Sequence, residues 1–370
     1  MTALLLGACL ASPVLAEEMR LMRFPDIHGD TVVFTYASDL WTAKREGGLA
    51  RRITSHPGQE TRARISPDGK FVAFSGEYDG NVDVFVVPIE GGEPKRLSYD
   101  PVSDLVLDWT PDGKIAYKSL SGTFNSKQPR MWVVDPKGGL PAASALQEVS
   151  DGSFSPDGKS MAFNRVSSHQ FNWRRYRGGT QGRISLYEFA TNKYSELPSK
   201  SENSWHPMWI GNAVYYASDR NLGTVNLYRY DLGNRQDRQL TTYADADIKW
   251  PASDGKSIVF ERDGYLHVFD IATSKTEKLA PMVLSDFLNA RPTVRSLGDQ
   301  ITSLSLSPSG VRVAVEARGE VFSVPKENGE TRNMTHSTRY RERFPAWSPD
   351  GQNIAFVSDA SGENEVYMQP

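Results

Sequence analysis

Residues 66–75 read Ser-Pro-Asp-Gly-Lys-Phe-Val-Ala-Phe-Ser, a tight turn followed at once by a run of strand-forming residues. Proline fixes φ at one central position of such a turn, and glycine tolerates positive φ near its end. The turn, intact or degenerate, occurs eight times, with glycines 40 to 55 residues apart. These glycines are Gly29, Gly69, Gly113, Gly158, Gly211, Gly255, Gly310 and Gly351. Such a period indicates a repeat architecture rather than independent domains.

Each repeat contains short segments rich in β-branched and aromatic residues, and no long segment has a helical period of 3.6. One segment follows the turn directly, a second comes a few residues later, and a third follows another turn. A fourth precedes the next turn. In the third repeat the third strand is blurred, and we expect it at residues 146–149. Four antiparallel strands every forty-odd residues are typical of a β-propeller blade.

The rhythm breaks between residues 281 and 302, after six repeats and before the last two. We therefore predict an all-β protein with one six-bladed β-propeller ring over residues 20–285. Residues 286–370 are then the first one to two blades of a second propeller. Trp109, Phe154, Trp250 and Trp347 stand just before their turns, and we expect them to pack between blades.

Composition excludes several classes of protein. The chain has 370 residues, 39% of them hydrophobic, with 42 basic and 45 acidic side chains and a mean hydropathy of −0.48. These values argue against a membrane-spanning protein and a disordered chain, and a net charge of −3 gives no basic field for nucleic acid. Cys9 is the single cysteine, so neither an internal disulfide nor a thiolate metal cluster can form.

The first 16 residues are predicted to be a signal peptide. A short apolar stretch leads to Val14-Leu15-Ala16, which suits a small-residue cleavage site. Residues 6–9 also resemble a lipoprotein box, so lipidation at Cys9 stays open. Either route predicts export, with a periplasmic location.

Three features resemble the tricorn protease family. Residues 25–30 (PDIHGD) with 39–41 (DLW) are similar to the start of such a protein. So are residues 173–184, WRRYRGGTQGRI, within a long excursion of the fourth repeat. The break near residue 290 fits the six-bladed and seven-bladed propellers of that family. The resemblance covers residues 20–370.

The resemblance implies the non-catalytic N-terminal region of a tricorn-like serine peptidase, and the predicted signal peptide adds that this peptidase is exported. The propellers are then expected to channel peptide or unfolded polypeptide to and from downstream PDZ-like and protease domains, in a homo-oligomer. The last repeat stops at Pro370 in its second strand, so we expect a fragment of a longer protein. The alternative is a stand-alone TolB-like periplasmic propeller that acts as a protein-binding scaffold.

No catalytic residue, cofactor or metal site is predicted in these 370 residues. The sequence contains no Gly-x-Ser-x-Gly elbow and no zinc motif, and its six histidines are scattered. His28 is expected to lie in a turn, and His267 is expected to be structural. Residues 99–108 contain no Lys or Arg, whereas the family resemblance implies a basic pair there that holds the substrate C-terminus.

The basic excursion is the candidate contact site. Guanidinium groups between aromatic side chains suit either a peptide carboxylate or a protein interface, and both interpretations stay open. The candidate peptide- or interface-contacting residues are Arg174, Arg175, Tyr176, Arg177 and Arg183.

Overall fold

The computed structural model describes residues 17–124, 128–166, 176–220, 223–284, 294, 296–337 and 339–370. Their contacts divide the chain into two compact units, residues 1–289 and 290–370. Nearly every regular element among them is a β-strand, and no helix in these stretches has the length and apolar character that a membrane span needs. The predicted signal peptide, residues 1–16, lies outside the described residues.

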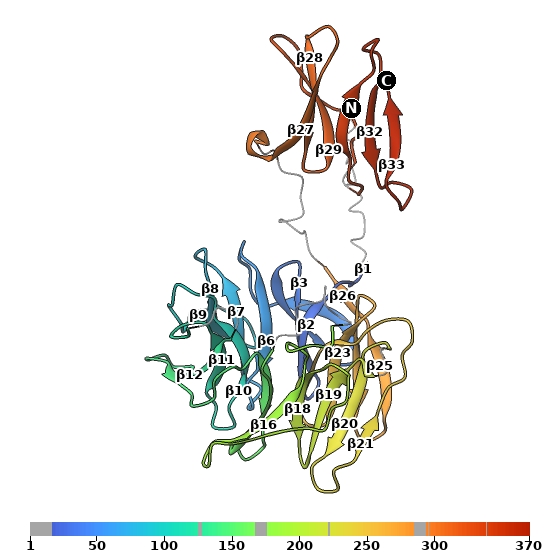
Figure 1. Ribbon diagram of the computed structural model, residues 1–370. Helices are drawn as coiled ribbons and strands as arrows, with labels where there is room; N and C mark the ends of the chain where they lie inside the picture. Colours follow the sequence, from blue (N-terminus) through green and yellow to red (C-terminus); the bar gives the residue numbers. More distant parts are fainter. Residues whose placement is uncertain are drawn as a thin grey trace, which may run out of the picture. The chain divides into compact units, whose positions relative to one another are not determined.

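The first unit contains six four-stranded antiparallel blades that follow one another around a ring (Figure 1). Blades 1 to 3 consist of β2 (Arg23–His28), β3 (Thr31–Tyr36), β4 (Asp39–Lys44), β5 (Gly47–Arg52); β6 (Glu60–Ile65), β7 (Phe71–Glu77), β8 (Val82–Pro88), β9 (Lys95–Arg96); β10 (Leu105–Trp109), β11 (Ile115–Ser119), β12 (Arg130–Val134) and β13 (Ala142–Ala143). Blades 4 to 6 consist of β14 (Asp151–Phe154), β15 (Ser160–Asn164), β16 (Ile184–Glu188), β17 (Lys193–Glu196); β18 (Ser204–Ile210), β19 (Ala213–Ser218), β20 (Asn226–Asp231), β21 (Asp237–Gln239); β22 (Lys249–Ser253), β23 (Ser257–Arg262), β24 (Tyr265–Asp270) and β25 (Lys275–Leu279).

The ring is closed by apolar packing between neighbouring blades. Six hydrophobic clusters each join two adjacent blades, and one of them joins blade 6 to blade 1 through residues such as Val32, Trp41, Val259 and Leu266. The innermost strands contact one another in the cyclic order β2, β6, β10, β14, β18, β22 and back to β2. The predicted six-bladed propeller is therefore confirmed, and its blades are built from consecutive strands.

A clasp strengthens the closure at the outer edge of blade 1. After blade 6 the chain returns as β26 (Pro281–Val283), which pairs in parallel with β5. The short strand β1 (Glu17–Glu18) then pairs antiparallel with β26 and forms the new edge of that sheet. Both ends of the ring are thus fixed to one blade, a mode of closure that the repeat pattern does not indicate.

The recurrent turn is stabilised by its own side chains. In residues 66–71 the Ser66 hydroxyl donates to Asp68 Oδ1 at 2.6 Å and accepts from the Phe71 amide at 2.9 Å. Gly69 closes the turn with φ of 73°, and the ring of His28 from blade 1 lies against it so closely that a Cβ there would be 2.9 Å from His28 Cδ2. The turn joins the first two strands of one blade, so the segment before each turn and the segment after it belong to the same sheet.

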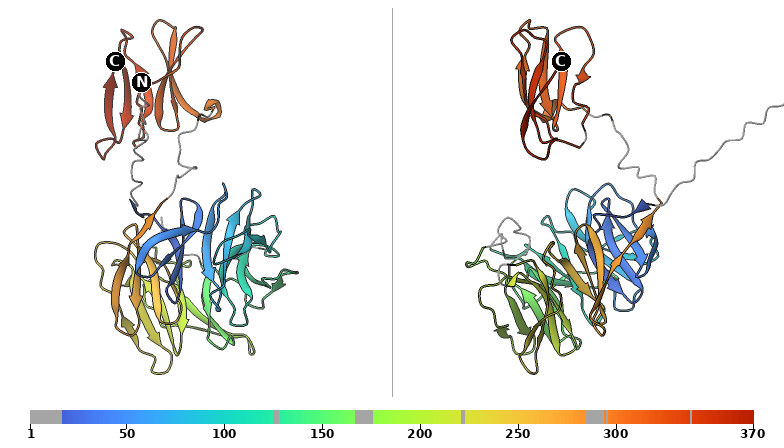
Figure 2. Two further views of the ribbon diagram at one scale, coloured as in Figure 1. Left: turned by 180° about the vertical axis from the view of Figure 1, so that it is seen from behind. Right: turned by 90° about the vertical axis from the view of Figure 1, so that its right-hand side faces the viewer.

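The second unit contains two further antiparallel blades, one of four strands and one of three (Figure 2). One has β27 (Ile301–Leu306), β28 (Arg312–Ala317), β29 (Glu320–Pro325) and β30 (Arg332–Asn333), and the other has β31 (Arg343–Trp347), β32 (Ile354–Ser358) and β33 (Glu365–Gln369). Ala314 and Val321 of the first pack against Ile354 and Phe356 of the second.

One strand position needs correction. The outer strand of blade 3 is Ala142–Ala143 rather than residues 146–149. Leu146 and Val149 are buried instead in the cluster between blades 3 and 4, because the connection to the next blade runs inward there. Apolar character marked these residues as buried, but it did not distinguish a strand from a packed connection.

Candidate functional site

Five of the six innermost strands of the ring carry a β-bulge, and the bulges influence which side chains reach the axis of the ring. In four blades the residue at the bulge has left-handed backbone geometry without being glycine, with φ of 50° at Phe24, 55° at Arg62, 53° at His206 and 48° at Trp250. A bulge bends its strand and redirects a side chain. Phe24, His206 and Trp250 each precede a proline, which has no N–H to lose from the strand ladder.

These four side chains meet around Trp250. The rings of Phe24 and Trp250 make an edge-to-face contact with centroids 4.7 Å apart, and the His206 ring centroid lies 4.8 Å from that of Trp250. The Arg62 guanidinium carbon lies 4.9 Å from the centroid of Trp250, at cation–π distance. The four residues come from blades 1, 2, 5 and 6, so this cluster, here called the axial plug, occupies the axis.

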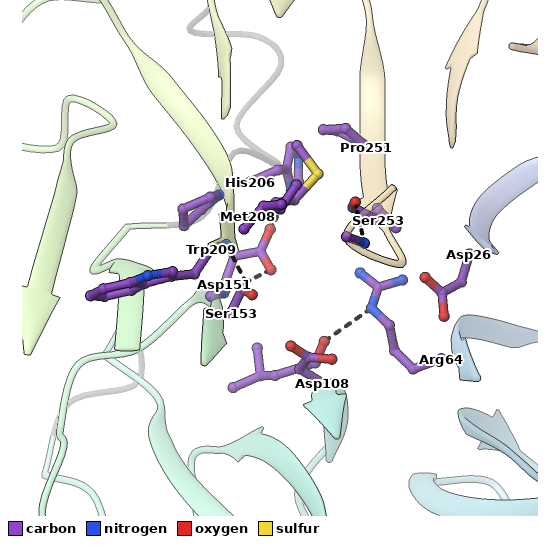
Figure 3. Close-up of a pocket in the computed structure, with 16 residues that line it drawn as sticks. Asp26, Arg64, Asp108, Asp151, Ser153, His206, Met208, Trp209, Pro251 and Ser253 are labelled. Carbon is purple, nitrogen blue, oxygen red and sulfur yellow. Dashed lines mark hydrogen bonds and ion pairs between the residues drawn. The ribbon is translucent and has the colours of Figure 1, made fainter. Parts of the chain in front are cut away.

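A cavity opens on the turn side of the axial plug. Figure 3 shows the side chains that line it. It contains about 470 Å³ of empty space, part of which is open to solvent, and the innermost strands of all six blades contribute to its wall. We call it the axial pocket. Its polar lining residues are Asp26, Arg64, Asp108, Asp151, Ser153, His206 and Ser253.

Asp151 is the charged acid of the axial pocket. Burial by itself would raise its pKa, but a hydrogen-bonded ion pair with His206 Nδ1 and the nearby charges of Arg62 and Arg64 hold the pKa well below the usual value. Burial lowers the pKa of Arg62 to about 10, which leaves the guanidinium charged at neutral pH. The pair Asp151–His206 therefore links the wall of the axial pocket to the axial plug.

The carboxyl groups of Asp26 and Asp108 are protonated more readily than that of Asp151. Burial raises the pKa of Asp26 to about 6 and that of Asp108 to about 7, although the Arg64 charge opposes both shifts. Figure 3 shows Arg64 extending between the two carboxyl groups. Its Nε donates to the Leu107 carbonyl at 3.1 Å and its Nη1 to the Ala63 carbonyl at 3.0 Å. Near neutral pH these two acids can donate as well as accept hydrogen bonds, which suits the mixed donors and acceptors of a polypeptide.

Glu60 is a buried acid with a structural role. Glu60, whose pKa burial raises to about 7, accepts from the Leu40 amide and from the hydroxyls of Thr54 and Tyr78. It thereby ties blade 1 to the start of blade 2. Blade 5 has a comparable hydrogen bond, in which the Thr241 hydroxyl accepts from the Leu227 amide. No group of three or more potential metal ligands lies together among the described residues.

The predicted contact residues lie elsewhere. Arg174 and Arg175 are outside the described residues. Arg177 makes a 3.0 Å ion pair with the buried Asp219, which follows β19 of blade 5, and the Tyr176 carbonyl accepts from Asn203 at 3.4 Å. Arg183 lies 3.6 Å from Glu196 of its own blade. Tyr176, Arg177 and Arg183 are not among the residues that line the axial pocket.

Trp250 departs from its expected role. Trp109, Phe154 and Trp347 belong to or pack against clusters between blades as predicted, but Trp250 is on the axis. It lies one residue further from its turn glycine than the other three do, and it occupies the bulge. The sequence signal that could have found it is a bulky residue followed by proline shortly before the turn, at 24–25, 206–207, 250–251 and 344–345.

Two of the histidine expectations can be checked. The ring of His28 lies against the turn glycine Gly69 of the next blade, and His267 stacks on Phe260 with centroids 5.7 Å apart. Burial lowers the pKa of His267, which favours the neutral imidazole. His206 is different, because it joins the axial pocket and the axial plug, a role that no sequence pattern predicted.

Comparison with known proteins agrees with this architecture. Residues 19–275 match the family described as the tricorn protease N-terminal beta propeller domain. The chain is 29% identical over 368 residues to tricorn protease homolog 1 of Streptomyces coelicolor. That alignment covers 94% of this chain and 33% of the homolog. It is 26% identical over 312 residues to the tricorn protease of Thermoplasma acidophilum, which covers 82% of this chain and 28% of that protein.

A crystal structure of the tricorn protease shares the fold. It superposes with a TM-score of 0.76 at 23% sequence identity, over 95% of this chain and 35% of that one. The chain thus spans about a third of the length of the relatives it matches.

Proposed function

The chain belongs to the family of the tricorn protease N-terminal β-propeller domain, and on this premise we propose that its first ring handles peptides at the axial pocket. In this role it is the non-catalytic propeller region of a tricorn-like serine peptidase. Peptide bond cleavage then takes place in a protease domain carried by the rest of the protein, with which the ring exchanges substrate or product.

The axial pocket is the observation that carries this proposal. All six innermost strands converge there, and the lining residues present charged, neutral and hydroxyl groups around one cavity. An extended peptide has alternating N–H and C=O groups, which need donors and acceptors on several sides when they leave water. Asp26 and Asp108, with pKa values of about 6 and about 7, and the Ser153 hydroxyl offer both kinds of group.

The wider setting is also a proposal. Residues 1–16 have the pattern of a signal peptide, which favours export and a periplasmic location. The relatives' names, which call them tricorn proteases, support our proposal that peptides or unfolded polypeptide are the ligands of the axial pocket. PDZ-like and protease domains of the same protein, in a homo-oligomer, are the proposed partners. The basic excursion at Arg177 and Arg183 is a second candidate contact for peptide.

A binding experiment tests the proposal and separates the two contact sites. Binding of a mixture of unstructured octapeptides to the 370-residue chain is measured by isothermal titration calorimetry, for the unmodified chain and for Arg64→Ala and Arg183→Ala. Arg64 lines the axial pocket, whereas Arg183 belongs to the basic excursion. We expect Arg64→Ala to weaken binding about tenfold, or about 1.4 kcal/mol, and Arg183→Ala to change it less than about twofold.

The opposite ranking would transfer the peptide site to the basic excursion. Absence of binding by the unmodified chain would contradict the proposed peptide handling altogether. Circular dichroism melting curves serve as the folding control for both variants, because each removes one guanidinium group from the surface of a strand or loop.

A further inference from the structure

Side chains from opposite sides of the ring meet at the level of the axial plug. Arg62 of β6 in blade 2 and His206 of β18 in blade 5 stand opposite each other in the six-blade order, and both contact Trp250 of β22 in blade 6. Trp250, whose ring centroid lies 4.9 Å from the Arg62 guanidinium carbon, therefore joins opposite sides of the ring across the axis. Phe24 and His206 fill two further sides of Trp250 at 4.7 Å and 4.8 Å between centroids.

The burial of these side chains shows that water does not fill the axis at this level. Trp250 is 4% exposed and Arg62 is 5% exposed, although both project from innermost strands. Side chains on the wall of an open, water-filled channel would be exposed to that water. The axial pocket on the turn side therefore ends at the axial plug and is blind.

The backbone of the axial plug is strained. Four non-glycine residues adopt φ between 48° and 55°, a region that costs bulky side chains free energy. Such strain persists only where the surrounding structure imposes it, and it occurs often in clamps and switches. All four of these residues converge on one contact, so their strain is concentrated where the axis is closed.

His206 connects the closure to the axial pocket. Its Nδ1 is paired with Asp151 in the pocket wall, and its ring packs on Trp250. A ligand that displaces His206 from Asp151 would remove one side of the support of Trp250. Occupancy of the axial pocket and the position of Trp250 are thereby mechanically linked.

We propose that Trp250 is the gate of the ring axis. In the free protein it closes the axis, and a polypeptide can cross the ring only after Trp250 has left its contacts with Arg62 and His206. The nature of the passing chain rests on the proposed function, but the closed state of the free protein does not.

The closed state can be measured directly with fluorine NMR. The chain is labelled with 5-fluorotryptophan, and the Trp250 resonance among the eight tryptophans is assigned with Trp250→Phe. The solvent isotope shift between H₂O and D₂O reports how far each indole contacts water. We expect a shift near zero for Trp250 and a measurable shift for Trp209, a half-buried residue that lines the axial pocket. Equal shifts for the two residues would overturn the proposal.

A matched pair of arginine variants tests what holds the gate. Arg62 and Arg64 are two residues apart on β6, but Arg62 contacts Trp250 whereas Arg64 lines the axial pocket. We expect Arg62→Ala to raise the isotope shift of Trp250 toward that of Trp209, and Arg64→Ala to leave it unchanged. The reverse result would refute the gate. Chemical-shift dispersion of the other tryptophans verifies that both variants are folded.

Titration with the octapeptides separates failure of the gate from failure of the proposed function. If peptides bind and the Trp250 resonance shifts while that of Trp132 in blade 3 does not, the link between pocket and gate is supported. If peptides bind and Trp250 does not respond, that link is refuted. If no peptide binds, the proposed function fails, and the isotope shift of the free protein still decides the closed state.

Discussion

The ring and the second unit are built from the same repeat, yet their strands differ in burial. In blade 2 of the ring, Val72, Ala73 and Phe74 are fully buried. In the second unit, Leu304 and Leu306 of β27 are 66% and 65% exposed. Val366 and Met368 of β33 are 76% and 70% exposed. A blade is a single sheet with two apolar faces. Among the described residues, only the closed ring places a neighbouring blade against both faces of every blade.

The bulge shows the same difference at the level of one residue. Phe344 in β31 has φ of 55° and precedes a proline, as Trp250 does, yet Phe344 is 62% exposed and Trp250 is 4% exposed. The left-handed residue therefore belongs to the bulge of the innermost strand, and Arg62, which precedes Ala63, shows that a following proline is not required. Its burial in an axial plug is a property of the ring, because six innermost strands must surround one axis.

Matched leucine truncations should give the largest difference between the two regions. Leu40 in the ring is fully buried, and Leu304 in the second unit is largely exposed. We expect Leu40→Ala to lower the free energy of unfolding of the ring by about 2–5 kcal/mol through lost burial and a cavity. Leu304→Ala should stay within about 0.5 kcal/mol. Urea unfolding with hydrogen exchange, which assigns each transition to its unit, measures both. Equal effects would mean that the faces of the second unit are covered.

Charges on the axis should make the stability of the ring fall as pH rises. Burial raises the pKa of Asp108 to about 7, above its unfolded value, so the folded state binds this proton more tightly. The stabilisation is complete below the unfolded pKa and is lost as pH rises through about 7. Asp108→Asn removes this dependence, and we expect it to stabilise the ring at pH 8 by at most about 4 kcal/mol.

Asp151→Asn is the control of opposite sign for this experiment. The pKa of Asp151 is lowered by His206, Arg62 and Arg64 against the effect of burial, so its charged form is favoured in the fold. We expect Asp151→Asn to destabilise the ring at pH 8. Asp151 is charged in both the folded and the unfolded state between pH 5 and 8, so its replacement should lower the urea midpoint by a constant amount there, whereas the effect of Asp108→Asn should grow with pH. Two variants that shift stability in the same direction at pH 8 would contradict the electrostatic assignment.

The difference in stability between a glycine and an alanine variant should be about the same at the Trp250 bulge and at the Phe344 bulge. Trp250→Ala loses a buried aromatic contact and Phe344→Ala loses little, so their total effects differ. At either site, however, glycine tolerates positive φ and alanine does not. We expect the glycine variant to be about 1 kcal/mol more stable than the alanine variant, the reverse of the usual order in a strand. Thermal unfolding of the four variants tests this, and a more stable alanine variant would contradict the bulge geometry.

The turns should show the smallest effect and no difference between the regions. The hydroxyls of Ser66 in the ring and Ser348 in the second unit each accept a backbone N–H and donate to the aspartate two residues later. We expect Ser66→Ala and Ser348→Ala each to cost about 1 kcal/mol. Ser361→Ala, whose exposed hydroxyl donates only to the Glu363 carbonyl, is the control. A large difference between Ser66 and Ser348 would show that the turn depends on its neighbours.

Local physics explains what could be predicted from the sequence. The Ser-Pro-Asp-Gly turn is stabilised by hydrogen bonds of its own serine hydroxyl and aspartate and by the positive φ of its glycine. It can therefore be recognised in the sequence wherever it occurs. Short strand-forming segments at a regular spacing then lead to four-stranded blades, and the break near residue 290 separates six repeats from two. The repeat, the blade and the number of blades on each side of the break therefore follow from the sequence without knowledge of the fold.

Tertiary structure alone decided which side chains share a site. The basic excursion stood out because its residues are adjacent in sequence, yet Arg177 and Arg183 are bound in ion pairs away from the axial pocket. Asp26, Arg64, Asp108, Asp151 and His206 come from five blades and looked ordinary one at a time. They meet only because the ring closes through packing of blade 6 on blade 1, and six separate strands then face one axis. Trp250 became part of that axis because a bulge, and not its distance from the turn, aims its side chain inward.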